Sequence, residues 1–125
     1  MRVITAVEKI KRNDGLMIFL AGGITNCPWW QNEIIEMLKG CVGTILNPRR
    51  KDFPIGDPNA SLEQITWEFN ALEKADIFSM WFSNAESDQP ICMYELGRNI
   101  ALRENEMSTV VIGVEPGYRR EQDVY

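Results

Sequence analysis

Four short apolar runs along the chain are bounded by turn-forming or charged residues and have the length of β-strands. Runs of this kind predict strands buried on both faces of a parallel sheet. They are Leu16–Ala21, Val42–Leu46, Asp76–Phe82 and Thr109–Val114. A looser alternation from Val3 to Ile10, followed by the turn signal Asp14-Gly15, predicts an additional edge strand near the N-terminus.

Helical periodicity fills the intervals between these runs. A first helix is expected to begin near Pro28, with Thr25 or Asn26 as its cap. A second helix is expected to begin at Ser61, the first residue of a capping-box pattern, and to end near Lys74.

A third helix is expected to open at Pro90, where Asp88 or Gln89 can cap it, and to run to about Arg103. This helix carries Glu95, which is expected to look towards the loops. Its apolar face is expected to pack on the sheet through Ile91, Met93, Leu96 and Ile100.

Strands that alternate with helices are typical of right-handed crossovers and of a parallel sheet covered on both faces. The sequence therefore predicts an α/β fold with four or five parallel strands, in a single domain spanning residues 1–125. The carboxyl ends of parallel strands meet at one edge of a sheet, where such folds bind their ligands. The candidate site is the group of loops that follow these strands.

The composition excludes several classes of function. A net charge of -5 and a pI near 4.8 argue against binding to a nucleic acid backbone. No apolar stretch approaches membrane length and no secretory leader is recognisable, so a cytoplasmic protein that does not bind membranes is expected. Three cysteines without a CxxC pair favour buried free thiols. Histidine is absent, which removes Ser-His-Asp and Cys-His nucleophiles and leaves carboxylates, hydroxyls or amines for any catalysis.

Two loops at the predicted edge carry residues suited to a small ligand. Gly22-Gly23-Ile24 offers backbone N–H groups to a phosphate or a sugar hydroxyl, although a turn that needs glycine explains the pair equally well. Trp30 and Gln31 can offer a nucleobase an aromatic face and an amide edge, but one of Trp29 and Trp30 is expected in the core. Arg49, in the run Arg49-Arg50-Lys51, can meet an anionic substrate or lie in solvent.

Four carboxylates are expected near this edge: Glu68, Asp76, Asp88 and Glu95. Two carboxylates flanking an anomeric carbon are typical of glycosyl transfer, in which one attacks the sugar and the other transfers a proton. Glu95 is available for such chemistry, and the Tyr94 hydroxyl can hold its unused oxygen. Asp76 can instead simply end the preceding helix.

Three short motifs match a known pattern in order and spacing over about residues 16 to 114: Phe19-Leu20-Ala21-Gly22-Gly23, Trp67-Glu68 through Leu72 to Ala75-Asp76, and Glu95-Leu96-Gly97. With them the chain resembles the nucleoside 2-deoxyribosyltransferase-like family. The resemblance implies a flavodoxin-like sheet and an enzyme that cleaves the N-glycosidic bond of a nucleoside or nucleoside 5′-monophosphate. The sugar would pass to another base or to water, and no cofactor or metal is implied.

The resemblance also assigns roles to individual residues. It places the nucleophile, which forms a covalent glycosyl intermediate, on Glu95. It places an acid that binds or protonates the base on Glu68 and a further acidic loop position on Asp88. The chain departs from the family where Asp88-Gln89-Pro90-Ile91 replaces Asp-x-Gly-Thr, where Gly23 replaces an aromatic residue, and where Glu68 replaces an aspartate. A homodimer or larger homo-oligomer is implied because the family's sites sit near subunit contacts.

Two alternatives stay open at this level. The same cleft could recognise a nucleotide or a nucleotide-derived signal without cleaving it, through Trp30, Arg49 and Arg50. A NAD-cleaving glycohydrolase would also use a glutamate on a sheet of this kind, although its dinucleotide needs a longer groove. The polar segment 115–125 shows no match to the family and has no assigned role.

Overall fold

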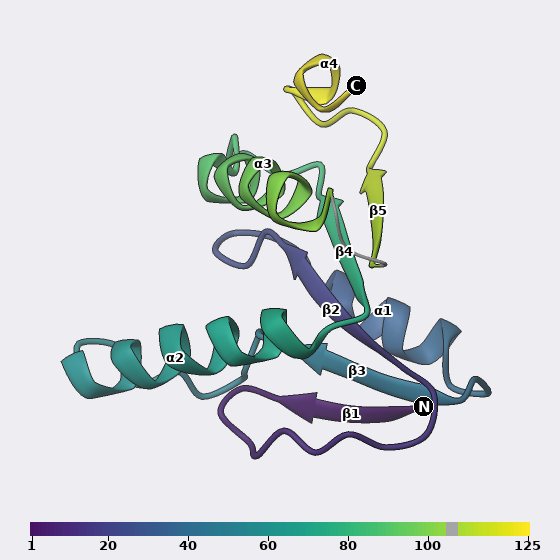
Figure 1. Ribbon diagram of the computed structural model, residues 1–125. Helices are drawn as coiled ribbons and strands as arrows, with labels where there is room; N and C mark the ends of the chain where they lie inside the picture. Colours follow the sequence, from purple (N-terminus) through teal and green to yellow (C-terminus); the bar gives the residue numbers. More distant parts are fainter. Residues whose placement is uncertain (105–107) are drawn as a thin grey trace.

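Five parallel strands form the centre of the protein, in the order β1-β3-β2-β4-β5 (Figure 1). The computed structural model describes residues 1–104 and 108–125. Its strands are β1 (Arg2–Thr5), β2 (Leu16–Gly22), β3 (Gly43–Asn47), β4 (Ile77–Phe82) and β5 (Thr109–Val114). The predicted flavodoxin-like parallel sheet is confirmed, and the N-terminal edge strand is shorter than the predicted Val3–Ile10.

Helices cover the two faces of this sheet unequally. They are α1 (Trp30–Met37), α2 (Pro58–Lys74), α3 (Pro90–Arg103) and the short α4 (Glu121–Val124). Figure 1 shows α1 behind the sheet, and α2 and α3 in front of it. Among the residues that the structure describes, no helix combines the length and the apolar character needed to cross a bilayer.

The period of two along each strand divides the core between these faces. Met17, Phe19 and Ala21 of β2 point to the side of α2 and α3, where they join a large apolar cluster. Leu20 points to the other side and packs with Trp30 of α1 and with β3. Because side chains fill both faces of the central strands, ligands have access to the sheet only at its edges.

The second helix begins one turn earlier than the capping-box pattern predicts. Asp57 is its N-cap, and the Asp57 carboxylate accepts a hydrogen bond from the Asn59 N–H at 2.9 Å. Pro58 fits the first turn because the N–H groups there have no acceptor within the helix, so the N–H that proline lacks costs no hydrogen bond. The Ser61 pattern therefore lies inside the helix, and the start at Asp57 lengthens α2 towards the loops.

The buried face of α3 differs from the prediction. Its buried residues are Cys92, Leu96, Asn99 and Arg103. Ile91 and Ile100, which were expected on the sheet, are 67% and 45% exposed. The polar residues can be buried because each finds backbone acceptors, Asn99 Nδ2 at Glu95 O and the Arg103 guanidinium at Leu72 O and Ala75 O. Compared with the prediction, α3 is thus rotated about its own axis, and Glu95 lies at the border of its buried face.

Candidate active site

A pocket of about 430 Å³ opens at the carboxyl edge of the sheet. Its walls come from the loop after β2, the connection after β3, the middle of α2 and the beginning of α3. The chain first leaves β2 for its neighbour β3 and later returns to its other neighbour β4. The pocket thus lies at the point where the strand order reverses, which is the usual ligand site of open α/β sheets.

Two carboxylates line this pocket, Glu68 from α2 and Glu95 from α3. Burial raises the pKa of Glu95. Burial, and then the negative charge of Glu95, raise the pKa of Glu68 to about 7. Neither forms an ion pair within the described part of the chain. Each of the two carboxyl groups therefore keeps its proton to a higher pH than an exposed glutamate does.

The other two carboxylates expected at this edge lie elsewhere. Asp76 precedes β4 and so sits at the opposite edge of the sheet, where it accepts hydrogen bonds from Met17 N and from Arg12. The expectation that it converges on the site is wrong. Asp88 is exposed and pairs with Arg119 at 3.3 Å, outside the pocket wall. Tyr94 also lies outside the wall and is 68% exposed.

A buried arginine determines the shape of the loop after β2. Arg49 is 8% exposed, and its guanidinium lies 4.0 Å from the centre of the Trp29 ring. It donates hydrogen bonds of 2.6 to 3.1 Å to the carbonyls of Ile24, Cys27 and Pro28 and to Gln31 Oε1. Residues 24–28 are thus wrapped around a cation. For this reason α1 begins at Trp30 and is not capped by Thr25 or Asn26.

The two predicted base-binding residues on α1 are buried beneath this loop. Trp30 is 4% exposed and donates from Nε1 to Gly23 O at 2.9 Å, whereas Trp29 is 42% exposed. The expectation that one tryptophan is buried and one exposed is confirmed. Gln31 is fully buried against Arg49. Neither Trp30 nor Gln31 belongs to the pocket wall.

Gly23 permits a close approach between this loop and the one before α3. A Cβ at Gly23 would lie 2.5 Å from Gln89 Oε1 and would also collide with Cys27 Sγ. Gln89 has a left-handed backbone, and its Nε2 donates to Ser83 O at 2.7 Å. Its side chain therefore folds into the pocket wall and does not cap α3, contrary to the prediction. Gly23 stands where the resemblance implied an aromatic residue, and this difference was the sequence signal for the contact.

Several other residues of the wall were not identified as site residues from the sequence. Gln64, one helical turn before Glu68, donates to Pro48 O at 2.8 Å and fixes α2 against the end of β3. Burial, and then the charge of Glu95, raise the pKa of Cys92 to about 12, which keeps its thiol protonated. Cys27 and Cys92 are buried as expected, but Cys41 is exposed. Phe53 completes this group, and Arg50, which was expected only in the alternative that binds a nucleotide without cleaving it, also lines the pocket.

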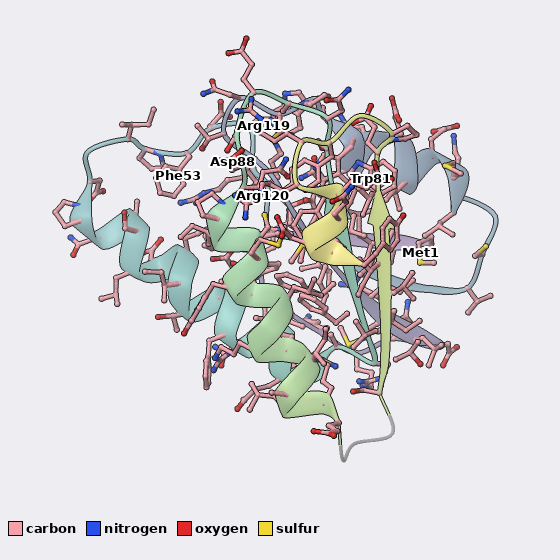
Figure 2. The ribbon with its side chains drawn as sticks, turned by 90° about the horizontal axis from the view of Figure 1, so that it is seen from above. Met1, Phe53, Trp81, Asp88, Arg119 and Arg120 are labelled. Carbon is pink, nitrogen blue, oxygen red and sulfur yellow. The ribbon has the colours of Figure 1, made fainter. Side chains whose placement is uncertain are left out.

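The C-terminal segment holds the loop that precedes α3. Tyr118 is 2% exposed, its ring lies 5.3 Å from that of Phe82, and its hydroxyl donates to Asp88 O at 2.5 Å. Figure 2 shows Asp88, Arg119 and Arg120 together near the beginning of α3. Residues 115–120, which had no assigned role, thereby position the first turn of the helix that carries Glu95.

The donor set does not suggest a metal site. Across residues 1–104 and 108–125, no three His, Cys, Asp or Glu side chains are grouped so that they could hold a metal ion. The residues of the pocket wall carry carboxylates, amides, guanidinium groups, the hydroxyls of Thr25 and Ser87 and the thiol of Cys92.

A family model described as "Nucleoside 2-deoxyribosyltransferase like" matches residues 15–118 of the 125. The match covers β2 to β5 and includes every element that contributes to the pocket. No curated protein matches the chain in sequence.

We predict that Glu68→Gln stabilises the protein at about pH 8 but not at about pH 4.5. Because the pKa of Glu68 is raised from 4.5 to about 7 on folding, the folded protein binds a proton that the unfolded chain releases within this range. The free energy of unfolding therefore falls as the pH rises through it. Removing the group should recover roughly 1–3 kcal/mol at the higher pH, measured by urea unfolding.

The matched control for this prediction is Glu63→Gln, an exposed position on the same helix. Its effect should be small and independent of pH. Equal effects of Glu68→Gln at both pH values would contradict the shifted pKa.

Tyr118→Phe should lower the free energy of unfolding by about 1–2 kcal/mol, because it leaves the Asp88 carbonyl without its donor in a partly buried place. Arg119→Gln removes only an exposed ion pair to the same residue and should cost less than about 1 kcal/mol. Urea unfolding of both variants measures the difference. If Arg119→Gln costs as much as Tyr118→Phe, the tail is not held through the tyrosine hydroxyl.

Proposed function

The chain belongs to the nucleoside 2-deoxyribosyltransferase-like family, and from this premise we propose that it cleaves the N-glycosidic bond of a nucleoside or nucleoside 5′-monophosphate. The observation that supports this most directly is the pair Glu68 and Glu95 in one pocket, with the pKa of Glu68 raised to about 7. Two carboxylates whose environments separate their pKa values can divide the roles of nucleophile and acid.

In the first half-reaction, a carboxylate oxygen of Glu95 attacks C1′ of the sugar. The bond from C1′ to the base nitrogen breaks, and its electron pair leaves with the base. Glu68 donates its proton to the departing base, which prevents the build-up of negative charge on it. The product is a glycosyl ester on Glu95, with Glu68 as a carboxylate.

In the second half-reaction, Glu68 acts as a general base. It takes a proton from water, or from the nitrogen of a second base, as that atom attacks C1′ and expels Glu95. Because each step inverts the configuration at C1′, the two steps together retain it. Water as acceptor makes the protein a hydrolase, and a base makes it a transferase.

The surroundings of Glu95 support its role as nucleophile. It is partly buried and forms no ion pair in the described residues, so its charge is poorly compensated. The Asn99 amide fixes the backbone carbonyl of Glu95 at 2.8 Å and leaves the carboxylate unused. A carboxylate in this condition is more reactive than one stabilised by an arginine.

Glu95→Gln should lower turnover by at least about a thousandfold without unfolding the protein, because an amide cannot form the glycosyl ester. Purified protein is incubated with ribo- and deoxyribonucleosides and their 5′-monophosphates, with and without an added free base, and the products are separated by chromatography. Glu63→Gln on α2 is the exposed control and should keep full activity. Full activity of Glu95→Gln on a confirmed substrate would overturn the assignment.

The pH dependence tests the role of Glu68. With a pKa of about 7 in the free enzyme, Glu68 loses its proton as the pH rises, so kcat/KM should fall above about pH 7. In Glu68→Gln the rate should be lower by about 10²- to 10⁴-fold, and this alkaline decline should disappear. A decline that persists in the variant would show that another group titrates.

A further inference from the structure

Arg50 lines the pocket and carries hydrogen-bond donors that are not satisfied. Its Nε and Nη2 atoms are buried and have no hydrogen-bond partner, and it forms no ion pair in the described residues. Its guanidinium carbon lies 4.8 Å from the centre of the Phe53 ring, which also lines the pocket. Figure 2 shows Phe53 on the connection that leads into α2. A desolvated guanidinium edge without an acceptor is costly, which indicates that a ligand supplies the acceptor.

The two cations next to Arg50 in the chain, Arg49 and Lys51, differ from it in this respect. Arg49 uses its guanidinium on the carbonyls of the loop after β2 and on Gln31. Lys51 is exposed and is not part of the pocket wall. Of three consecutive cations, only Arg50 therefore combines contact with the pocket and free donors.

The arrangement of the free donors indicates which acceptor fits. Nε and Nη2 lie on one edge of the planar guanidinium, and their N–H bonds point in nearly the same direction. This edge matches two oxygens of one phosphate or carboxylate group. Stacking on Phe53 fixes the plane of the group, so the edge is oriented before a ligand arrives.

We propose that Arg50 binds the 5′-phosphate of the substrate, so that the protein acts on nucleoside 5′-monophosphates in preference to nucleosides. The inference rests on the proposed function, because it takes the ligand to be a nucleoside or its phosphate. The phosphate is the group of such a ligand that carries full negative charge. Glu68 and Glu95 repel it from their part of the pocket, so the sugar lies against the carboxylates and the phosphate lies at Arg50.

The test measures binding, so that it does not depend on turnover. Calorimetry of Glu95→Gln with nucleosides and with their 5′-monophosphates gives the ratio of the two dissociation constants for each base. The monophosphate should bind about tenfold or more tightly than its nucleoside. In Glu95→Gln with Arg50→Gln this advantage should fall to about twofold or less, while the affinity for the nucleoside stays the same.

Lys51→Gln is the matched control, since it removes the same charge one residue away from the pocket, and it should keep the advantage of the monophosphate. Arg50→Lys keeps the charge but loses the two-donor edge, so its advantage should be intermediate. Thermal unfolding checks that each variant is folded.

Three results would overturn the proposal: equal binding of nucleosides and monophosphates, an equal loss for both in Arg50→Gln, or no binding of any monophosphate. NAD⁺ is an additional probe, and Arg50-dependent binding of NAD⁺ tighter than that of every monophosphate would also overturn it. If monophosphates bind through Arg50 but are never cleaved, the proposed reaction fails and the assignment of Arg50 stands.

Discussion

The burial of two carboxylates, Glu68 and Glu95, in one pocket is the constraint on which the site depends, because the two helices that carry them could relieve it by turning apart. Hydrogen bonds at two points along α2 prevent this. Arg103 of α3 donates to the last carbonyls of α2, at Leu72 and Ala75, and Gln64 ties the same helix to the end of β3. The helices hold both carboxylates in the pocket, where burial, and then the charge of Glu95, raise the pKa of Glu68 to about 7.

Three arginines, Arg49, Arg50 and Arg103, show how the same type of side chain serves different roles. Arg49 and Arg103 are almost fully buried and donate to backbone carbonyls that no helix or strand satisfies. They act as cross-links between segments distant in sequence. Arg50 follows Arg49 in the chain and lines the pocket, but its buried Nε and Nη2 have no acceptor among the described residues. Arg49 and Arg50 differ in role because the carbonyls of the loop after β2 surround the guanidinium of Arg49 and accept its hydrogen bonds.

Local patterns predicted the strands and the sheet type, because periodicity and short motifs are properties of neighbouring residues. They placed four carboxylates at the site, of which Glu68 and Glu95 line the pocket and Asp76 and Asp88 do not. They failed where distant segments decide. The rotation of α3 depends on acceptors for Asn99 and Arg103, and the start of α1 depends on Arg49. Gln89 enters the wall because Gly23, far away in the chain, leaves room for it. Contacts between segments that are distant in the chain leave no periodic pattern in the sequence, so they could not be predicted from it.

The wrapping of residues 24–28 around Arg49 also limits how this pocket can change in evolution. A loop of this kind normally varies independently of the scaffold beneath it. Here its carbonyls are satisfied by a side chain from the connection after β3, so a loop of another length or path would leave a buried cation without acceptors. New ligand preferences would arise more readily at Arg50 and Phe53, whose side chains contact each other at the pocket and take no part in holding this loop.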